Sequence, residues 1–303
     1  MKTYRYRIFN LTIESTLECP DLIPGDYLNP DVTLRRGKVP DALTDAVVRT
    51  DYYQASDNQF LLNIENVAKY LITNGKQILI DKYPEGNEDS VMVFLLGSAM
   101  GALLHQRGML PLHASAIEFR GKSIAFIGPS GIGKSTLAGA FQARNYRVLA
   151  DDLCVITFDH AGLPTVLPGN PNLKLWSDSV IFLGKDVSDF RRVQSDINKH
   201  KIPLLNSFCD TPVLLERIYL LENSVNGQLS LESIQGERKL TILLENTYRS
   251  NYLLVNESIL PYLKQCVEVA KKIGLKKVIR PETFTSQDAF VKLIESDLKS
   301  ETS

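Results

Sequence analysis

The chain has 303 residues, of which 44% are hydrophobic and 23% charged, a balance that indicates a folded globular protein and excludes a largely disordered one. Its formal net charge is -1 at pH 7, so no overall field attracts nucleic acid or an anionic membrane. This length is enough for two ordinary domains or one large one.

The cysteines and the apolar segments indicate where the protein works. The four cysteines stand alone in the sequence, without the spacing of a disulfide framework or a zinc site: Cys19, Cys154, Cys209 and Cys266. The N-terminal residues lack the apolar core of a signal peptide, and the longest apolar stretch, Val91 to Leu104, is short for a membrane span. We therefore expect a cytoplasmic protein that binds neither nucleic acid nor membrane.

The first hundred residues are predicted to be rich in β-strands. Strands are expected within residues 3–15, 31–37, 59–64 and 69–81. The dipeptide Asn74-Gly75 predicts a hairpin turn inside the last of these segments. A helix is expected over residues 90–108, ending near Gly108.

The pattern then changes to strands alternating with helices, which predicts an α/β domain. Strands are expected at residues 113–119, 123–128, 146–150 and 217–222, and helices at 133–145, 173–184, 237–248, 259–274 and 286–300. Residues 189–201 are mixed in charge and predicted to form a solvated loop, with a mobile lid as the alternative. We predict a boundary near residue 107, between a β-rich N-terminal domain (1–106) and an α/β domain with a mixed sheet (107–303).

The clearest motif is "GPSGIGKST", which matches the phosphate-binding loop pattern G-x-x-x-x-G-K-[ST]. Glycines let the backbone curl so that its N–H groups face a phosphate, and the following helix directs its positive end at the same anion. Lys134 would neutralise the β- and γ-phosphates, and the Ser135 hydroxyl would hold Mg²⁺. The expected nucleotide-binding residues are Gly128, Pro129, Ser130, Gly131, Ile132, Gly133, Lys134, Ser135 and Thr136. The alternative is a glycine-rich turn without a ligand.

Two neighbouring carboxylates, Asp151 and Asp152, interrupt an apolar run. Asp151 follows Lys134 by 17 positions, room for one helix and one short strand. A right-handed crossover makes that strand parallel to the strand before the loop, so both end at the same sheet edge. Because adjacent residues of an extended chain point in opposite directions, one acid is expected to serve Mg²⁺ and the other an incoming hydroxyl. The alternative is an exposed turn with both acids solvated.

These residues together resemble the catalytic domain of the HPr kinase/phosphorylase family, with the histidine at His113, the phosphate loop and the Ala-Asp-Asp strand end. The resemblance implies a P-loop kinase that uses ATP and Mg²⁺. It implies that Asp151 is the catalytic base, His113 its partner, and Ser135 and Asp152 the magnesium residues. The family carries a glutamate-containing segment downstream. The comparable stretch of this chain, "LPGNPNLKLWSDSV", contains Lys174 and no glutamate.

The layout as a whole is similar to the HPr-kinase-like proteins of lasso-peptide gene clusters, through "LHASA", "PNLKLW" and "TYR". That group implies a kinase for the C-terminal serine of a precursor peptide, so the expected partner is a peptide or protein that carries an acceptor serine. Lys174 and Arg249 are cations able to bind its carboxylate or the transferred phosphate, or else ordinary surface residues. Trp176 is expected to pack within the fold, and clamping of a peptide is the alternative.

The alternatives are a kinase of HPr, a kinase of free serine or another small hydroxyl compound, an ATPase, and a nucleotide-regulated binding module. The chain has no LSGGQ-like segment, which transporter ATPases need. The sequence leaves the acceptor and the oligomeric state open.

Overall fold

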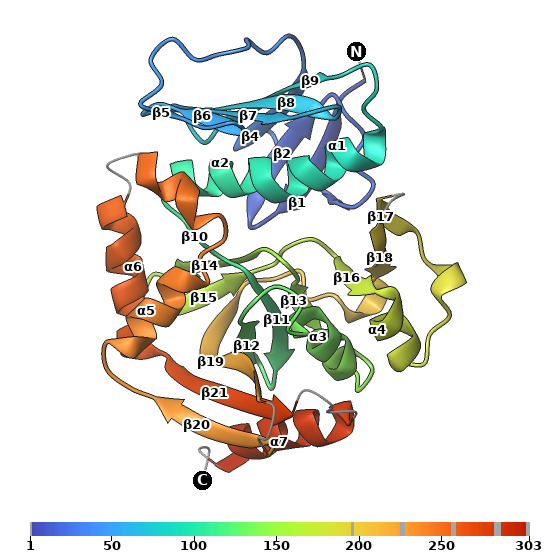
Figure 1. The fold of residues 1–303 in the computed structure, drawn as a ribbon, viewed down its shortest axis with the longest axis vertical. Coiled ribbons are helices and arrows are strands. Elements are labelled where there is room, and N and C mark those ends of the chain that lie inside the picture. Colours follow the sequence, from blue (N-terminus) through green and yellow to red (C-terminus); the bar gives the residue numbers. More distant parts are fainter. Residues whose placement is uncertain (1, 195–196, 225–227, 256–258, 282–285, 301–303) are drawn as a thin grey trace.

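A computed structural model of the chain describes residues 2–194, 197–224, 228–255, 259–281 and 286–300. Figure 1 shows a β-sheet at one end, a long helix beneath it, and a second sheet flanked by helices. The protein is of the predicted α/β class, and its β-rich part comes first.

The N-terminal sheet has nine strands within the described residues, in the order β3-β1-β2-β4-β9-β8-β7-β6-β5. Its strands are β1 (Tyr4–Ile8), β2 (Leu11–Ser15), β3 (Ile23–Pro24), β4 (Val32–Arg36), β5 (Val48–Arg49), β6 (Tyr53–Ala55), β7 (Gln59–Ile64), β8 (Ala68–Thr73) and β9 (Gln77–Lys82). The hairpin between β8 and β9 turns at Asn74 and Gly75, both with positive φ, as the dipeptide predicts. Residues alternate between buried and partly exposed along β2 and β8, so one face of this sheet is apolar.

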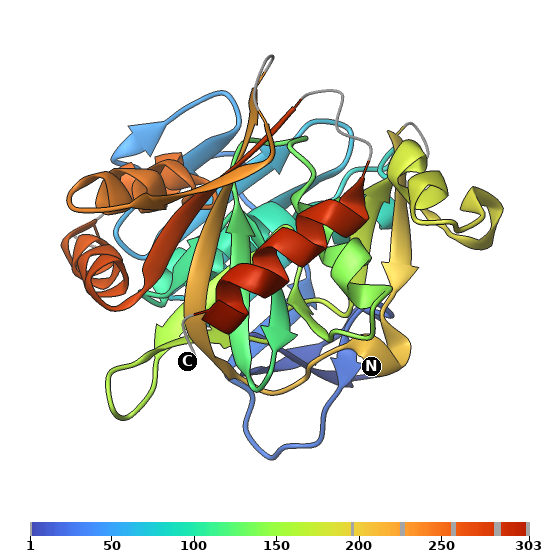
Figure 2. The ribbon, with the colours of Figure 1, turned by 90° about the horizontal axis from the view of Figure 1, so that it is seen from below.

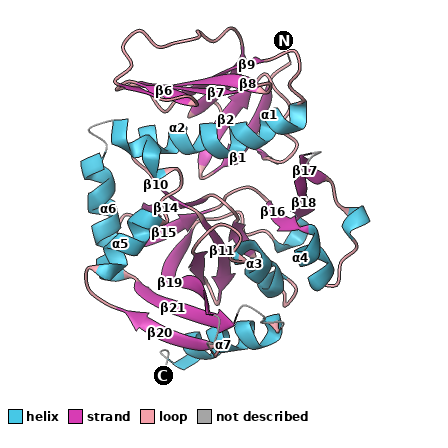
Figure 3. Cartoon of the chain, in the orientation of Figure 1, coloured by secondary structure: helices cyan, strands magenta, loops and turns pink. Residues whose placement is uncertain are grey.

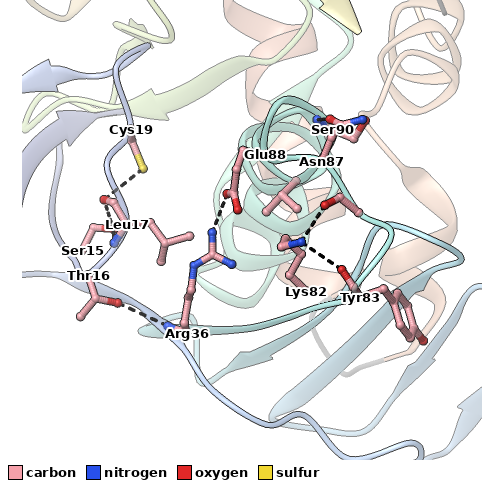
Figure 4. A network of polar contacts seen from close by, with 12 residues as sticks. Ser15, Thr16, Leu17, Cys19, Arg36, Lys82, Tyr83, Asn87, Glu88 and Ser90 are labelled. Atoms are coloured by element: carbon pink, nitrogen blue, oxygen red, sulfur yellow. Dashed lines mark hydrogen bonds and ion pairs between the residues drawn. The ribbon is translucent and has the colours of Figure 1, made fainter. Parts of the chain in front are cut away.

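That apolar face is covered by one helical stretch, made of α1 (Glu88–Phe94), a π-helical segment (Leu95–Ala99) and α2 (Met100–Gln106). The Asn87 side chain caps its first turn by accepting the Ser90 N–H at 2.7 Å. Figure 4 shows the approach to this cap, where Lys82 donates to the backbone carbonyl of Gly86 at 2.7 Å and Arg36 pairs with Glu88. The helix is buried along most of its length because it lies between two sheets.

The second sheet carries the phosphate loop. Its order is β10-β14-β15-β19-β12-β11-β13, with β21 beside β19 and β20 beside β21. These strands are β10 (Leu110–Leu112), β11 (Ala114–Phe119), β12 (Lys122–Ile127), β13 (Val148–Ala150), β14 (Cys154–Phe158), β15 (Pro164–Leu167), β19 (Val213–Ser224), β20 (Ser230–Ile234) and β21 (Gly274–Pro281). Strands β12, β19 and β21 run parallel, so their carboxyl ends meet at one edge.

Helices cover both faces of this sheet. On one face lie α3 (Lys134–Gln142) and α7 (Gln287–Ser300), which crosses the strands in Figure 2. On the other lie α5 (Arg238–Glu245) and α6 (Ile259–Lys272). Strand β12 accordingly sends alternate apolar side chains into two different cores. Within the described ranges, no helix is both long and apolar enough to cross a membrane.

A three-stranded sheet stands beside α3 and corrects two expectations (Figure 3). Residues 173–184 were expected to form one helix, but the structure has β16 (Asn172–Trp176) followed by α4 (Ser177–Phe182). The charged stretch 189–201 was expected to be a loop, but it contributes to β17 (Arg192–Gln194) and β18 (Ile197–Pro203); residues 195 and 196 lie outside the described residues. Both errors have one cause: Leu173 and Leu175 alternate with polar residues, and β18 pairs with them.

One apolar core joins the N-terminal sheet to the rest of the chain. Besides that sheet and the helix beneath it, this core includes Leu153, Val155, Leu167, Tyr248 and Tyr252. The chain passes from α2 to β10 near residue 107, where the sequence predicts a domain boundary. The division into two domains stays a prediction.

Candidate active site

The phosphate loop connects β12 to α3, as the motif predicts. Gly128, Gly131 and Gly133 have φ of 137°, 81° and 98°, conformations that favour glycine. At Gly128 a Cβ would lie 2.8 Å from the Leu221 carbonyl oxygen on the neighbouring strand. Glycine is therefore favoured at all three positions by the backbone conformation, and at Gly128 also because a side chain would clash with the neighbouring strand.

The strand that carries the two aspartates is parallel to the strand that precedes the loop. Strand β11 lies between them and is antiparallel to both β12 and β13. The crossover prediction is therefore confirmed, with one strand inserted. Asp151 and Asp152 follow the carboxyl end of β13, at the same edge as the loop.

Lys134 is the first residue of α3 and is buried. Its ammonium donates to the carbonyl oxygens of Gly128 at 2.8 Å and Pro129 at 3.1 Å. Burial lowers the pKa of Lys134 to about 8, although the carboxylates of Asp152 and Asp151 act in the opposite direction. The lysine is thus a cation at neutral pH that has given up much of its hydration.

Asp151 is also buried, and neutral donors satisfy its carboxylate. One oxygen accepts the Ser115 hydroxyl at 2.6 Å, and the other accepts the backbone N–H of Lys174 at 2.8 Å. Asp151 therefore ties β13 to β11 and to β16.

Asp152 faces the His113 imidazole and the ammonium group of Lys174. One oxygen lies 3.4 Å from Nδ1 of His113, and the other 3.1 Å from the Lys174 ammonium. Burial would raise the pKa of Asp152, but Lys174, Lys199 and His113 outweigh it and lower the pKa to about 2. Asp152 is therefore ionised throughout the physiological range.

His113 and Lys174 respond to burial in different ways. Burial and the nearby Lys134 lower the pKa of His113, and Asp152 opposes them only in part. Burial also acts to lower the pKa of Lys174, but Asp152 overcomes it and raises that pKa. At neutral pH the site thus holds a neutral imidazole and a charged lysine on either side of one carboxylate.

This arrangement corrects the expected pairing of His113 with Asp151. The imidazole lies against Asp152, and Asp151 is turned toward Ser115. The expected pairing was carried over from the family resemblance; in this structure the chain leaves the strand at Ala150 and Asp152 has a φ of 71°. In this left-handed turn the directions of side chains no longer follow the pleat.

Two cavities meet at Asp152. The smaller, of about 110 Å³, is lined by the loop residues Ser130, Gly131, Gly133, Lys134, Ser135 and Thr136 together with His113, Asp152, Lys174, Trp176 and Lys199. The larger, of about 650 Å³, is lined by Asp152, His113, Gly128, Pro129 and Ser130 together with Glu222, Glu245 and the segment Asn246–Arg249. Asp151 lines neither cavity.

The segment Asn246–Arg249, which follows α5, forms one wall of the larger cavity. The side-chain oxygen of Asn246 accepts the backbone N–H of Gly128 at 2.8 Å. The backbone carbonyl of Asn246 accepts the backbone N–H of His113 at 2.8 Å. The Tyr248 ring lies 6.1 Å from the His113 ring, and burial raises the pKa of Tyr248 to about 12. Arg249 is exposed and has a φ of 53°, a conformation that functional sites often retain at a cost.

Sequence reasoning missed Ser115, Asn246 and Lys199, which come from three distant segments. Ser115 carries the one usable signal, a hydroxyl flanked by apolar residues in β11, the strand that precedes β12. Asn246 and Lys199 lie in ordinary polar stretches, and only the fold places them beside the phosphate loop. Pro129 and Ile132 contribute backbone carbonyls, which accept from Lys134 and Arg280.

The donor set fits a magnesium ion that is held mainly by nucleotide phosphates. Mg²⁺ prefers oxygen ligands and usually takes one or two protein groups besides phosphate and water. Ser135 and Asp152 line the same cavity and offer a hydroxyl and a carboxylate. Among the described residues no cluster of three or more His, Cys, Asp or Glu side chains could hold a metal alone.

No protein-family model and no curated protein matches the chain. Among solved structures, the chain is similar to the Hpr(Ser) kinase/phosphatase from Coxiella burnetii, at 11% sequence identity and a TM-score of 0.36. That match covers 63% of this chain and 95% of the other.

Proposed function

We propose that this protein is an ATP-dependent kinase that transfers the γ-phosphoryl group to a serine hydroxyl. The observation that carries the proposal is the position of Asp152. It lies where the cavity lined by the phosphate loop meets a larger cavity, with His113 beside it. One cavity suits a phosphate donor, and the other is large enough for an acceptor side chain and its flanking groups.

The donor would be held by the loop and by Lys134. The backbone N–H groups of residues 131–136 would bind the phosphates together with the positive end of α3. Mg²⁺, held through Ser135 and Asp152, would supply charge neutralisation at the phosphate oxygens.

The acceptor proton would pass to the Asp152–His113 pair. In this proposal Nδ1 of the neutral ring carries the proton and faces the Asp152 carboxylate, 3.4 Å away, which leaves Nε2 as the acceptor. In the transfer, the serine oxygen forms a bond to Pγ while its proton moves to His113. The bond between Pγ and the β–γ bridging oxygen breaks, and its electron pair stays on the ADP leaving group. Asp151 then has a positioning role, because it fixes β16 and hence Lys174 beside Asp152.

For the acceptor we propose the C-terminal serine of a lasso precursor peptide. Arg249, exposed at the larger cavity, is a donor suited to a terminal carboxylate. HPr and free serine remain the competing acceptors.

The deciding experiment offers Mg-ATP and three acceptors separately, with mass spectrometry of the products. The acceptors are a lasso precursor peptide ending in serine, HPr, and free serine. We expect phosphate on the terminal serine of the peptide, and much less on the same peptide with an amidated C-terminus, because Arg249 then loses its carboxylate. Transfer to HPr or free serine alone would keep the kinase and change its acceptor. ATP hydrolysis without transfer to any acceptor would favour an ATPase.

The rate should depend on pH through two groups. We expect kcat/KM for Mg-ATP to rise with pH through the lowered pKa of His113, because only the neutral imidazole accepts a proton. It should fall above about pH 8, where Lys134 loses the charge that binds phosphate. Titration of Asp152 does not affect the pH–rate profile in this range, since its pKa is about 2. His113→Gln should remove the acid limb and leave the alkaline one; an acid limb that persists in this variant would contradict the role of His113.

A further inference from the structure

Lys199 lies on the wall of the smaller cavity that faces the phosphate loop. It belongs to β18 and stands directly opposite Trp176 of β16 in the strand pair. Its ammonium is 5.9 Å from the centre of the Trp176 ring, and both residues line the cavity together with Lys134 and Ser135. Lys199 thus faces the loop from a separate sheet.

Among the residues that the structure describes, Lys199 has no carboxylate of its own around this cavity. Asp151 is satisfied by two neutral donors, and Asp152 is paired with Lys174 and His113. No ion pair joins Lys199 to a carboxylate in the described part of the chain. Its charge nevertheless reaches the site, because it helps to lower the pKa of both Asp152 and Lys134. Three lysines and one aspartate line the cavity, so its wall carries a surplus of positive charge.

Lys201, on the same strand, differs from Lys199 because its charge is paired with a carboxylate. Lys201 lies two residues further along β18, on the same face, and faces Lys174 across the pair. The Lys201 ammonium is 2.6 Å from the Asp21 carboxylate, so an ion pair within the protein balances its charge. The cation–π contact with Trp176 holds Lys199 without neutralising it.

We propose that Lys199 is a catalytic residue that binds the terminal phosphoryl group of the donor from the side opposite the loop. This inference rests on the proposed kinase function. During transfer the bond from Pγ to the bridging oxygen breaks as the bond to the acceptor oxygen forms, and negative charge spreads over the three equatorial oxygens and the leaving group. Lys134 approaches from the loop and Lys199 from β18, so the two cations stabilise this charge from two sides.

Calorimetric titration with nucleotides tests the inference without turnover. In Lys199→Met, the dissociation constant of the β,γ-imido analogue of ATP should rise about tenfold, the worth of one charge-assisted hydrogen bond. The dissociation constant of ADP should stay near the wild-type value, because ADP lacks the terminal group. The matched control is Lys201→Met, which removes the same charge from the same face and should change neither affinity. Lys199→Arg should keep most of the preference for the triphosphate.

Trp176 gives an independent spectroscopic signal, since it is the only tryptophan in the chain and lines the same cavity. Its emission should change more with the imido analogue than with ADP in the wild type, and equally with both in Lys199→Met. Thermal unfolding of both variants checks that they fold.

Three results would overturn the inference. Equal affinities in Lys199→Met and Lys201→Met would remove Lys199 from the site. An equal loss for ADP and the imido analogue would place its contact on an inner phosphate. A wild-type protein that binds neither nucleotide would refute the proposed function, and the role of Lys199 with it.

Discussion

Asp152→Asn is expected to lower kcat for phosphoryl transfer by about 10²- to 10⁴-fold, the usual contribution of a general acid–base group. The amide cannot stabilise a protonated His113, and it leaves the half-buried Lys174 ammonium without its counter-ion. Affinity for Mg-free ADP should change far less, since Lys134 and the loop amides are untouched. Single-turnover kinetics with ADP titration separate the two effects.

Asp151→Asn provides the matched comparison, because it removes the same charge one residue away. Its carboxylate is enclosed by the Ser115 hydroxyl and the Lys174 N–H, so the main expected effect is a lower melting temperature. If Asp151→Asn abolishes transfer while Asp152→Asn keeps it, the assignment implied by the family resemblance is right and the one drawn from the geometry is wrong.

Lys134→Met is expected to weaken ATP binding by about 10- to 100-fold, since a hydrogen bond to a charged group contributes about 1.5–3 kcal/mol. Calorimetry measures this loss directly. The same substitution should not weaken the fold, because the apolar side chain fills the site without a charge that must be desolvated.

The pH dependence of stability tests whether Lys134 is a desolvated charge in the folded protein. The pKa of Lys134 is lowered from 10.5 to about 8, so the folded protein binds fewer protons than the unfolded chain between these values. The unfolding free energy of the wild type, relative to that of Lys134→Met, should therefore increase as pH rises from 8 to 10.5. A difference that stays constant over this range would mean that Lys134 is not desolvated in the fold.

Local signals predicted correctly the strand and helix elements that carry the central residues of the candidate site. The loop motif, the helix after it and the short strand before the aspartates all lie within residues 122–152, and a single crossover rule places them at one edge. The hairpin at Asn74-Gly75 was predictable for the same reason, because its turn depends on two adjacent residues.

The rest of the site depends on pairings between distant segments. Trp176 and Lys199 come together only because β16 pairs with β18, and the charged sequence of β18 gives no alternation to reveal it. Asn246 reaches Gly128 across 118 positions of sequence. The expected partner of His113 was Asp151, carried over from the family resemblance, and the structure instead places the imidazole against Asp152, which stands in a left-handed turn.

The glycines of the long helix carry a consequence for protein engineering. A Cβ at Gly101 would lie 2.9 Å from the Tyr248 ring, and one at Gly97 would lie 3.1 Å from its hydroxyl. Tyr248 contacts Arg249 and lies in the same segment as Asn246, whose side chain accepts the backbone N–H of Gly128, the first glycine of the phosphate loop. The same helix is covered on its other side by the N-terminal sheet. Residues 107–303 are therefore a poor choice for a stand-alone catalytic fragment, and a chimaera that exchanges acceptor specificity should carry the sheet, the helix and residues 246–252 as one block.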